Sequence, residues 1–274
     1  MKVVNDPKPA PSYNGRHAEV YDLFYADKPY KAEADFVHQC LQMFGSGTVR
    51  HVLELACGTG SHALALERHG YRIIATDYSE DMLRVGRAKA ASERSSVEFR
   101  WQDMRTLDVP EAPFDAIISL FDSIGYVATD EALQRVLSNV RRHLGKEGLF
   151  VFEFWHAAAM LRNYDPVRVR RSSTPEGELL RISTTTLESD AGLANVAYSI
   201  YELHKDGTYS VTSETQTNRY FLVQEMAKLL DCAGLVPVHW FGGFRADSPI
   251  TKDTWHIVGV AKPAETWNTR GRTS

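Results

Sequence analysis

The run VLELACGTGSHALAL, from Val52 to Leu66, constrains the fold more than any other part of the chain. Its first half is a compact apolar segment with the length of a buried strand, and its second half spaces apolar residues as a helix does. Gly58 and Gly60 stand between the two halves, where glycine lets the backbone turn sharply and approach a ligand closely. The free N–H groups at the start of the helix favour an anionic group. The run therefore predicts a strand, a tight turn and a helix that form a ligand site.

Hydrophobic periodicity on either side of this run alternates helix with short apolar strand from about residue 29 to residue 155. Five strands joined by helices on both faces make a Rossmann-like, doubly wound and mainly parallel sheet. Ligands of such sheets bind beyond the carboxyl ends of the strands. The expected strands are 51–56, 72–76, 97–101, 114–120 and 149–154, and the expected helices begin near residues 29, 61, 79 and 130.

Between Arg168 and Tyr220 the pattern changes to long alternating segments, rich in Thr and Tyr and separated by the turns PEG, SDAG and KDG. This pattern predicts an antiparallel β insertion of three or four strands. A helix at 223–233 and two strands at 236–241 and 254–261 then complete a seven-stranded α/β sheet. We expect one domain over 13–262 with the insertion at 165–220, a loose arm at 1–12 and a frayed tail at 263–274.

Composition excludes several classes of partner. With 31 Lys and Arg against 35 Asp and Glu, the chain has no uniform positive field for nucleic acid. Its longest apolar stretches are strand-sized, well short of the about 20 residues that cross a bilayer, so no membrane partner is expected. The opening MKVVNDPKPAPS lacks the apolar segment of a signal peptide, which favours the cytoplasm. Three cysteines without CxxC spacing suit reduced thiols, and no metal site is expected.

Acidic residues end the second and third expected strands. Asp77 stands where a carboxylate can accept hydrogen bonds from both hydroxyls of a ribose. Asp103 stands where it can accept from an adenine amino group while the amide of Met104 donates to the ring. Both positions lie at the same sheet edge as the glycine turn, so the three motifs together indicate a nucleoside-containing ligand.

Glu54 with Gly58 and Gly60, then Asp77, then Asp103 resemble the motifs of the class I S-adenosylmethionine-dependent methyltransferases. In that family an acidic residue, a spacer and G-x-G follow strand one, and acids follow strands two and three. The resemblance covers about residues 13–262 and implies S-adenosyl-L-methionine as cofactor and an antiparallel hairpin made by the last two strands. Further cofactor contacts are expected at Tyr21, Ala56, Tyr78, Met82 and Leu120.

Two other functions are open. GTGSHA also satisfies the G-x-G-x-x-A of NAD(P)-dependent Rossmann enzymes, and Tyr201 with Lys205 imitates the Tyr-x-x-x-Lys pair of short-chain dehydrogenases. That pair needs a helix, where four residues span about 6 Å, whereas VAYSIYELHK alternates as a strand, which separates them by about 13 Å. A non-catalytic module that binds S-adenosylmethionine is the third possibility.

The segment SLFDSIGY, from Ser119 to Tyr126, bears on the methyl acceptor. It lacks the Asn/Asp-Pro-Pro-Tyr/Phe motif of family members that methylate planar nitrogen. It is most similar to the small-molecule methyltransferases of sugar and natural-product pathways, among them the nucleotide-linked amino-sugar N-methyltransferases, which have a similar FSSIGH segment. Tyr126 stands where that group has His. The resemblance implies methyl transfer to an amine or hydroxyl of a small molecule.

Polar and aromatic residues after strands four and five are the candidates for the reaction. Asp122, Tyr126 and His156 can orient an acceptor and remove its proton, and His156 is the expected base because its ordinary pKa lies near neutrality. The β insertion can also join two copies in a homodimer. Further candidates near the methyl group are Tyr21, Tyr25, Glu153 and Trp155, and five arginines could bind a diphosphate or carboxylate or simply form a solvated sheet face: Arg162, Arg168, Arg170, Arg171 and Arg181.

Overall fold

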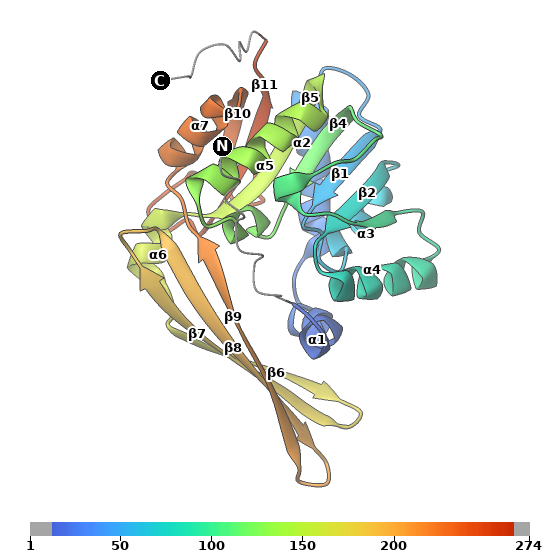
Figure 1. The fold of residues 1–274 in the computed structure, drawn as a ribbon, viewed down its shortest axis with the longest axis vertical. Helices are drawn as coiled ribbons and strands as arrows, with labels where there is room; N and C mark the ends of the chain where they lie inside the picture. The colour runs from blue at the N-terminus through green and yellow to red at the C-terminus, as the bar shows by residue number, and fades with distance from the viewer. Residues whose placement is uncertain (1–12, 266–274) are drawn as a thin grey trace, which may run out of the picture.

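The computed structural model describes residues 13–265, which form a seven-stranded sheet and a four-stranded sheet (Figure 1). The larger sheet has the strand order β10-β11-β5-β4-β1-β2-β3. Strands β1 to β5 are parallel, and β11 runs antiparallel to both of its neighbours. This confirms the predicted sheet and its C-terminal hairpin. The strands are His51–Leu55 (β1), Arg72–Asp77 (β2), Glu98–Trp101 (β3), Phe114–Ser119 (β4), Leu144–Trp155 (β5), Leu235–Gly242 (β10) and His256–Pro263 (β11).

Alternation along the parallel strands explains why helices cover both faces. Leu53 packs into one apolar cluster with helices α5 (Asp130–His143) and α7 (Val223–Cys232). Its neighbour Val52 packs into a second cluster with α2 (Tyr30–Phe44), α3 (Ser61–Glu67) and α4 (Glu80–Glu93). Successive side chains of a strand point to opposite faces, so a strand that is apolar at every position must be covered on both faces of the sheet. Figure 1 shows the two helical layers.

The insertion is an antiparallel sheet of four strands in the order β6-β7-β8-β9, the upper bound of the prediction. The alternating pattern of VAYSIYELHK is confirmed as strand. A short helix that the sequence analysis did not predict, α6 (Ala157–Asn163), leads into it from β5. The insertion strands are Val167–Thr174 (β6), Gly177–Glu188 (β7), Leu193–His204 (β8) and Tyr209–Arg219 (β9).

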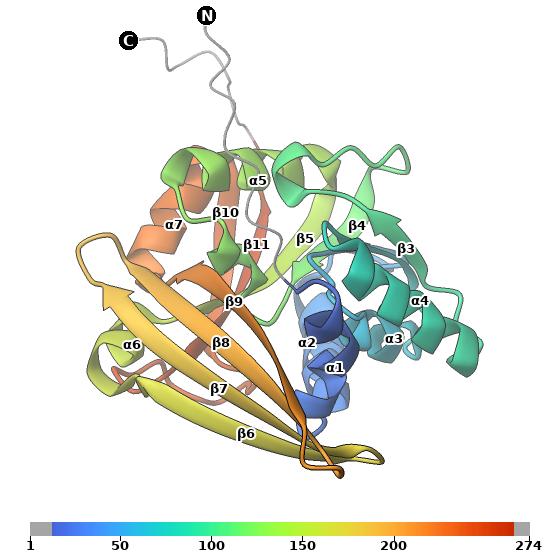
Figure 2. The same cartoon turned by 60° about the horizontal axis from the view of Figure 1, so that its bottom comes forward.

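The N-terminal helix α1 (Arg16–Phe24) packs against the insertion sheet, as Figure 2 shows. Phe24 lies in an apolar cluster with Leu179 of β7 and Ile200 of β8. The guanidinium of Arg16 donates to both carboxylate oxygens of Glu202 at 2.8 and 2.6 Å. Helix α1 is thereby held over the edge of the larger sheet at which its parallel strands end.

Two short 3-10 helices, η1 (Met104–Thr106) and η2 (Ser123–Tyr126), follow β3 and β4. None of the helices between residues 13 and 265 has the length and apolar character that a bilayer crossing requires. The arm expected at 1–12 and residues 266–274 of the expected tail lie outside the described residues. At the start of that tail, Pro263 is the last residue of β11, and the Ala264 amide donates to the carbonyl of Gly234 at 2.9 Å.

Candidate active site

A cavity of about 380 Å³ lies where the carboxyl ends of β1, β2, β4 and β5 meet α1 and the insertion sheet. Ten of the fourteen residues that the sequence analysis assigned to the site line it. Four do not: Gly60, Asp103, Met104 and His156. The ten that do are Tyr21, Glu54, Ala56, Gly58, Asp77, Tyr78, Met82, Leu120, Asp122 and Tyr126.

The glycine turn after β1 holds Asp77 at the cavity wall. Gly58 has a φ of +56°, in the left-handed region that favours glycine, and its amide donates to Asp77 Oδ2 at 2.8 Å. Asp77 Oδ1 accepts from the amide of Ser79 at 2.8 Å. Burial raises the pKa of Asp77 to about 6, against these two hydrogen bonds. Each carboxylate oxygen keeps a lone pair for a further donor, as a ribose requires.

Gly60 has a packing role. Its φ is +73°, and a Cβ at this position would lie 2.4 Å from ring atoms of Phe99. The ring of Phe99 therefore occupies the space that a side chain would need, which lets β3 pack beneath the turn. Gly60 shapes the turn, while Gly58, which comes earlier in the motif, faces the cavity.

Glu54 is a buried carboxyl without a full set of partners. Glu54 is the next-to-last residue of β1 and is 2% exposed, and its Oε2 has no hydrogen-bond partner among the described residues. Burial, reinforced by the negative charge of Asp77, raises the pKa of Glu54 to about 8. A carboxyl left in this state is suited to a cationic ligand. A buried acceptor, a ribose-type carboxylate and an open glycine turn in one cavity together fit S-adenosylmethionine.

Cofactor binding is expected to release a proton from Glu54. At pH 7 a carboxyl with a pKa of about 8 is mostly protonated, and an ammonium placed beside it lowers that pKa. Affinity for S-adenosylhomocysteine should therefore rise as the pH increases from 6 to 8. Calorimetry in buffers of different ionisation enthalpy measures the released protons. Glu54→Gln should abolish the pH dependence above pH 7, where Asp77 is already mostly ionised, and a wild-type affinity that is flat between pH 7 and 8 would contradict the assignment.

The structure does not bring the predicted adenine contacts Asp103 and Met104 to the cavity. Asp103 caps η1, where its carboxylate accepts from the amide of Arg105 at 2.9 Å and pairs with the Arg105 guanidinium. Met104 packs against the apolar cluster under α5. The Asp103 carboxylate thus finds its hydrogen-bond partners within the helical turn that follows it. Its predicted role toward adenine stays a prediction.

Aromatic rings enclose the centre of the cavity. Successive ring centroids lie 5.4 Å apart for Tyr13 and Tyr21, 4.7 Å for Tyr21 and Tyr25, and 5.0 Å for Tyr25 and Phe121. The hydroxyl groups of Tyr13 and Tyr126 are 2.6 Å apart. The π faces of such rings attract a cation and exclude water. Tyr13 precedes α1 and belongs to no motif, so nothing in its sequence surroundings indicated a place at the site.

Tyr126 is suited to orienting a substrate. Its hydroxyl donates to Gln216 Oε1 of β9 at 3.2 Å. Burial raises the pKa of this phenol above its usual value, and the neighbouring Tyr198 adds to the effect. A phenol that holds its proton more tightly than in water is a poor base at neutral pH, so hydrogen bonding is the role that the structure supports.

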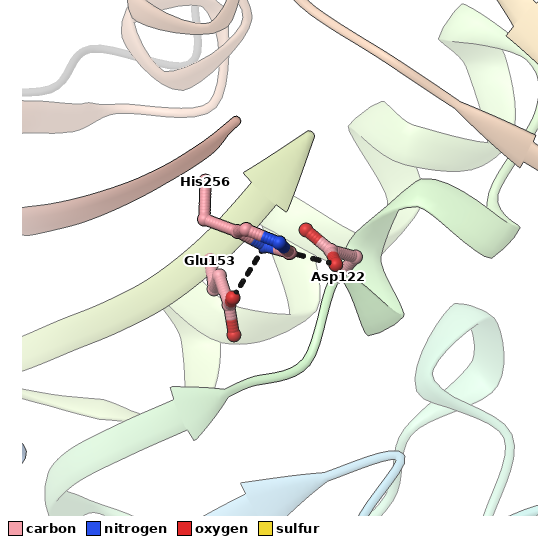
Figure 3. A group of neighbouring side chains, drawn as sticks. All are labelled: Asp122, Glu153 and His256. Carbon is pink, nitrogen blue, oxygen red and sulfur yellow. Dashed lines mark ion pairs between the residues drawn. The ribbon is translucent and has the colours of Figure 1, made fainter. Parts of the chain in front are cut away.

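Three charged side chains meet at the ends of β4, β5 and β11 (Figure 3). His256 Nδ1 lies 2.8 Å from Glu153 Oε1 and 3.3 Å from Asp122 Oδ2. The side chains of Glu153 and Asp122 are 2% and 3% exposed. Glu153 Oε2 also accepts from the amide of Phe121 at 2.5 Å, whereas Asp122 Oδ1 has no partner among the described residues. Asp122, which lines the cavity, thus has one carboxylate oxygen that is buried and unpaired within residues 13–265.

Electrostatics hold His256 as a cation. Its burial disfavours the imidazolium, but the two carboxylates outweigh this cost and raise the pKa of His256. Burial, followed by the nearby Glu153 charge, raises the pKa of Asp122 against the attraction of His256. The same three groups have ligand atoms within 4.8 Å of one another, yet a protonated Nδ1 cannot ligate a metal ion. The expectation of a metal-free site stays a prediction.

The sequence analysis named His156 as the base, and the structure places His256 at the cavity instead. His156 does not line the cavity, and its Nδ1 lies 3.0 Å from the carbonyl of Thr254. His256 begins β11, which runs antiparallel to β5 and pairs His256 with Trp155. The first residue of an antiparallel strand lies at the edge where parallel strands end. We expected a strand from residue 254, which put His256 within it and hid this position.

Of the five arginines considered, Arg168, Arg170 and Arg181 line the cavity. Arg162 and Arg171 instead lie near acidic residues, Asp253 and Glu178. The dehydrogenase-like pair is not formed at the cavity, because Tyr201 lies in β8 and neither it nor Lys205 belongs to the lining. The cavity therefore has a cofactor wall from the larger sheet and a second wall from the insertion.

Comparison with known proteins agrees with this geometry. A family model described as a methyltransferase domain matches residues 52–148. A putative methyltransferase of Geobacillus sp. (strain WCH70) is 30% identical over 133 residues, which cover 48% of this chain and 53% of that protein. The dTDP-3-amino-3,4,6-trideoxy-alpha-D-glucopyranose N,N-dimethyltransferase of Streptomyces venezuelae is 32% identical over 145 residues, 52% of this chain and 59% of that protein. These matches thus span little more than half of either relative.

A solved S-adenosylmethionine-dependent methyltransferase of Clostridium acetobutylicum ATCC 824 is similar in fold over nearly the whole chain. The TM-score is 0.77 at 23% identity, with 90% of this chain and 97% of that chain covered. Strand order, glycine turn and strand-end acids define a Rossmann-like methyltransferase fold. The chain has the fold of the class I S-adenosylmethionine-dependent methyltransferases, with a methyltransferase domain matched at residues 52–148.

Proposed function

We propose that this chain transfers the methyl group of S-adenosylmethionine to an amine or hydroxyl of a small molecule, with an amine on a sugar or natural-product intermediate as the favoured acceptor. The observation that carries the proposal is the cavity itself. Its cofactor wall is continuous with a second wall of polar and aromatic side chains from α1 and β6–β9. A concave cavity with both walls in contact suits a small-molecule acceptor.

S-adenosylmethionine supplies a methyl group that is already electrophilic, so the protein's task is to position the acceptor and to receive its proton. Asp122 Oδ1 is the free acceptor oxygen at the cavity for an N–H or O–H of the acceptor molecule. The ion pairs of His256 with Asp122 and Glu153 keep that carboxylate ionised and fixed. The Tyr126 hydroxyl donates to Gln216, so its oxygen can accept a hydrogen bond from the acceptor molecule, and the aromatic rings exclude water.

The relatives support the choice of acceptor. The Streptomyces venezuelae enzyme is named as an N,N-dimethyltransferase of a dTDP-linked amino sugar. At 32% identity over about half of each chain, this favours an amine acceptor without identifying the sugar. Tyr126, in the position where that group has His, is consistent with a different division of roles, in which a carboxylate takes the place of the base.

Removal of the Asp77 carboxylate tests the cofactor site. Asp77→Ala eliminates a charge-assisted contact to both ribose hydroxyls, so affinity for S-adenosylhomocysteine should fall about 30-fold to 100-fold. Isothermal calorimetry measures it. Asp108→Ala, at an exposed aspartate away from the cavity, is the matched control and should bind normally. Equal affinity in a folded Asp77→Ala protein would remove Asp77 from the site.

A screen of methyl acceptors tests the reaction. Methyl transfer from labelled S-adenosylmethionine to small amines and alcohols, including amino sugars, should give a labelled product. Binding of S-adenosylhomocysteine without any product across such a panel would favour the non-catalytic module. Tight binding of NAD in place of S-adenosylhomocysteine would overturn the proposal altogether.

A further inference from the structure

Arg181 of β7 is a buried cation without an anionic partner. The residue is 5% exposed and lines the cavity. Its Nε is fully buried and has no hydrogen-bond partner, and no carboxylate of residues 13–265 forms an ion pair with its guanidinium. A buried charge is ordinarily paired, because leaving it unpaired forfeits the solvation it had in water. This pattern is expected where a ligand supplies the missing charge.

Three aromatic rings surround this guanidinium but carry no negative charge that could pair with it. Its central carbon lies 4.8 Å from the ring centroid of Phe24, 4.9 Å from that of Tyr25 and 5.3 Å from that of Tyr198. Such cation–π contacts stabilise the charged group. The N–H groups point outward in the plane of the guanidinium, where they need acceptor atoms. The rings therefore hold Arg181 in a fixed orientation while its donors remain available.

The surroundings of Arg181 reinforce the positive charge. Arg170 of β6 pairs with Arg181 in the strand register, and its Nη1 donates to the carbonyl of Phe24 at 2.8 Å. Unlike Arg181, Arg170 is exposed, and it has no ion-pair partner among residues 13–265. Ser183 and Thr185 follow at alternate positions of β7 and line the same cavity with their hydroxyl-bearing side chains. Two guanidinium groups and two hydroxyls thus face the cavity from the insertion.

The opposite charge lies on the other wall. Asp122 and Glu153 carry two carboxylates against the single cation of His256, so the ends of β4 and β5 are net negative. The cavity is therefore polarised, negative where the acceptor must meet the methyl group and positive on the insertion sheet. A molecule with an amine at one end and an anionic group at the other complements both walls.

We propose that Arg181 is the anchor for a carboxylate or phosphate of the methyl acceptor, with Arg170 as a second positive group. The proposal rests on the proposed function, since it assigns an anionic class of substrate to the same cavity. A guanidinium donates two parallel hydrogen bonds to either oxyanion, so both share one recognition chemistry. The anion fixes the distance of the amine from the methyl group by anchoring the far end of the acceptor.

Anion titration tests the anchor without knowledge of the acceptor. Acetate and inorganic phosphate are titrated separately into protein loaded with S-adenosylhomocysteine, with chloride as the reference for ionic strength. Trp155 and Trp255 line the cavity, so tryptophan fluorescence reports binding there. We expect saturable binding of one or both oxyanions, and the tighter one identifies the source as carboxylate or phosphate.

Matched variants locate the anion. Arg181→Met keeps the length of the side chain and should weaken oxyanion binding at least about tenfold, because the bidentate contact is lost. Arg171→Met is the control, since Arg171 lies on the same sheet with a side chain that is 68% exposed and does not line the cavity. Arg181→Lys keeps the charge without the planar pair of donors and should weaken binding by a smaller factor. It serves as the second variant if Arg181→Met does not fold.

The outcomes separate this proposal from the proposed function. Oxyanion binding that is weakened by Arg181 variants and not by Arg171→Met supports the anchor. Oxyanion affinity no better than that of chloride, or unchanged in folded Arg181 variants, overturns the anchor while normal S-adenosylhomocysteine affinity leaves the methyltransferase function intact. Failure of the wild-type protein to bind S-adenosylhomocysteine would instead contradict the proposed function, whatever the anions do.

Discussion

Gly58→Val should lower the affinity for S-adenosylhomocysteine at least about a thousandfold, the largest loss expected of any single change in the cofactor wall. A Cβ at this position has room in the ligand-free protein, where its nearest neighbour is Met82 Cε at 3.5 Å. It would project into the cavity, in the space that the cofactor needs. The φ of +56° adds strain for a β-branched residue. Calorimetry with S-adenosylhomocysteine measures the loss.

Gly70→Val separates the effect of backbone strain from the effect of a side chain in the space that the cofactor needs. Gly70 also has a positive φ, +87°, and no atom lies within 4 Å of the point that a Cβ would occupy there. It follows α3 and does not line the cavity. The control should therefore show a comparable drop in melting temperature with normal cofactor affinity. Normal cofactor occupancy in a crystal of Gly58→Val would contradict the assignment of the turn.

His256→Gln should reduce turnover about 10²-fold to 10⁴-fold, the range over which a positioned proton acceptor contributes to a rate. Without the imidazolium, Asp122 and Glu153 are two buried carboxylates with nothing between them to balance their charge. One of them then takes up a proton, and the free oxygen of Asp122 no longer accepts from the substrate as a carboxylate. Affinity for S-adenosylhomocysteine should change by less than about threefold, because these groups are not assigned to the donor.

His156→Gln is the matched control at a histidine one strand away. His156 is also buried, but its ring faces the carbonyl of Thr254 and not the cavity. We expect turnover close to that of the wild type once the fraction of folded protein is taken into account. Loss of turnover in His156→Gln with full activity in His256→Gln would restore the assignment made from the sequence.

The pH profile of turnover should carry the signature of Asp122. Its pKa is raised to about 6, so its carboxylate is lost as the pH falls through that value. Turnover of the wild type should therefore decline below pH 6, and Asp122→Asn should remove that limb along with most of the rate. An acid limb that survives in Asp122→Asn would assign the titration to the acceptor amine.

Much of this fold could be predicted because its rules are local. The turn around Gly58, the capping of α5 and the alternation in β8 are all visible within a dozen residues of sequence. The cavity residues Glu54 and Asp77 could be placed for the same reason, since the end of a parallel strand is the edge at which such sheets bind ligands.

What could not be predicted depends on pairing between distant segments. His256 reaches the site only because β11 is antiparallel to β5. Neither the residue types nor their spacing in the sequence indicate that strand direction. Asp103 satisfies its carboxylate with Arg105, a contact that depends on the turn adopted after β3. Arg181 looked like one of several arginines on a solvated sheet face, and its burial becomes visible only once Phe24 and Tyr25 of the N-terminal segment pack over it.

The insertion sheet has a consequence for engineering. One continuous segment, Val167–Arg219, supplies the sheet of the acceptor-side wall, whereas α1 and the cofactor wall come from residues well before it in the chain. Replacing this insertion with that of a related protein could therefore change the acceptor specificity while the donor site stays intact. One close contact limits such a replacement: a Cβ on Gly125 would lie 1.9 Å from Asn218 Oδ1 and 2.7 Å from the Arg219 carbonyl oxygen. Any exchanged segment must end in a strand that still closes onto this glycine.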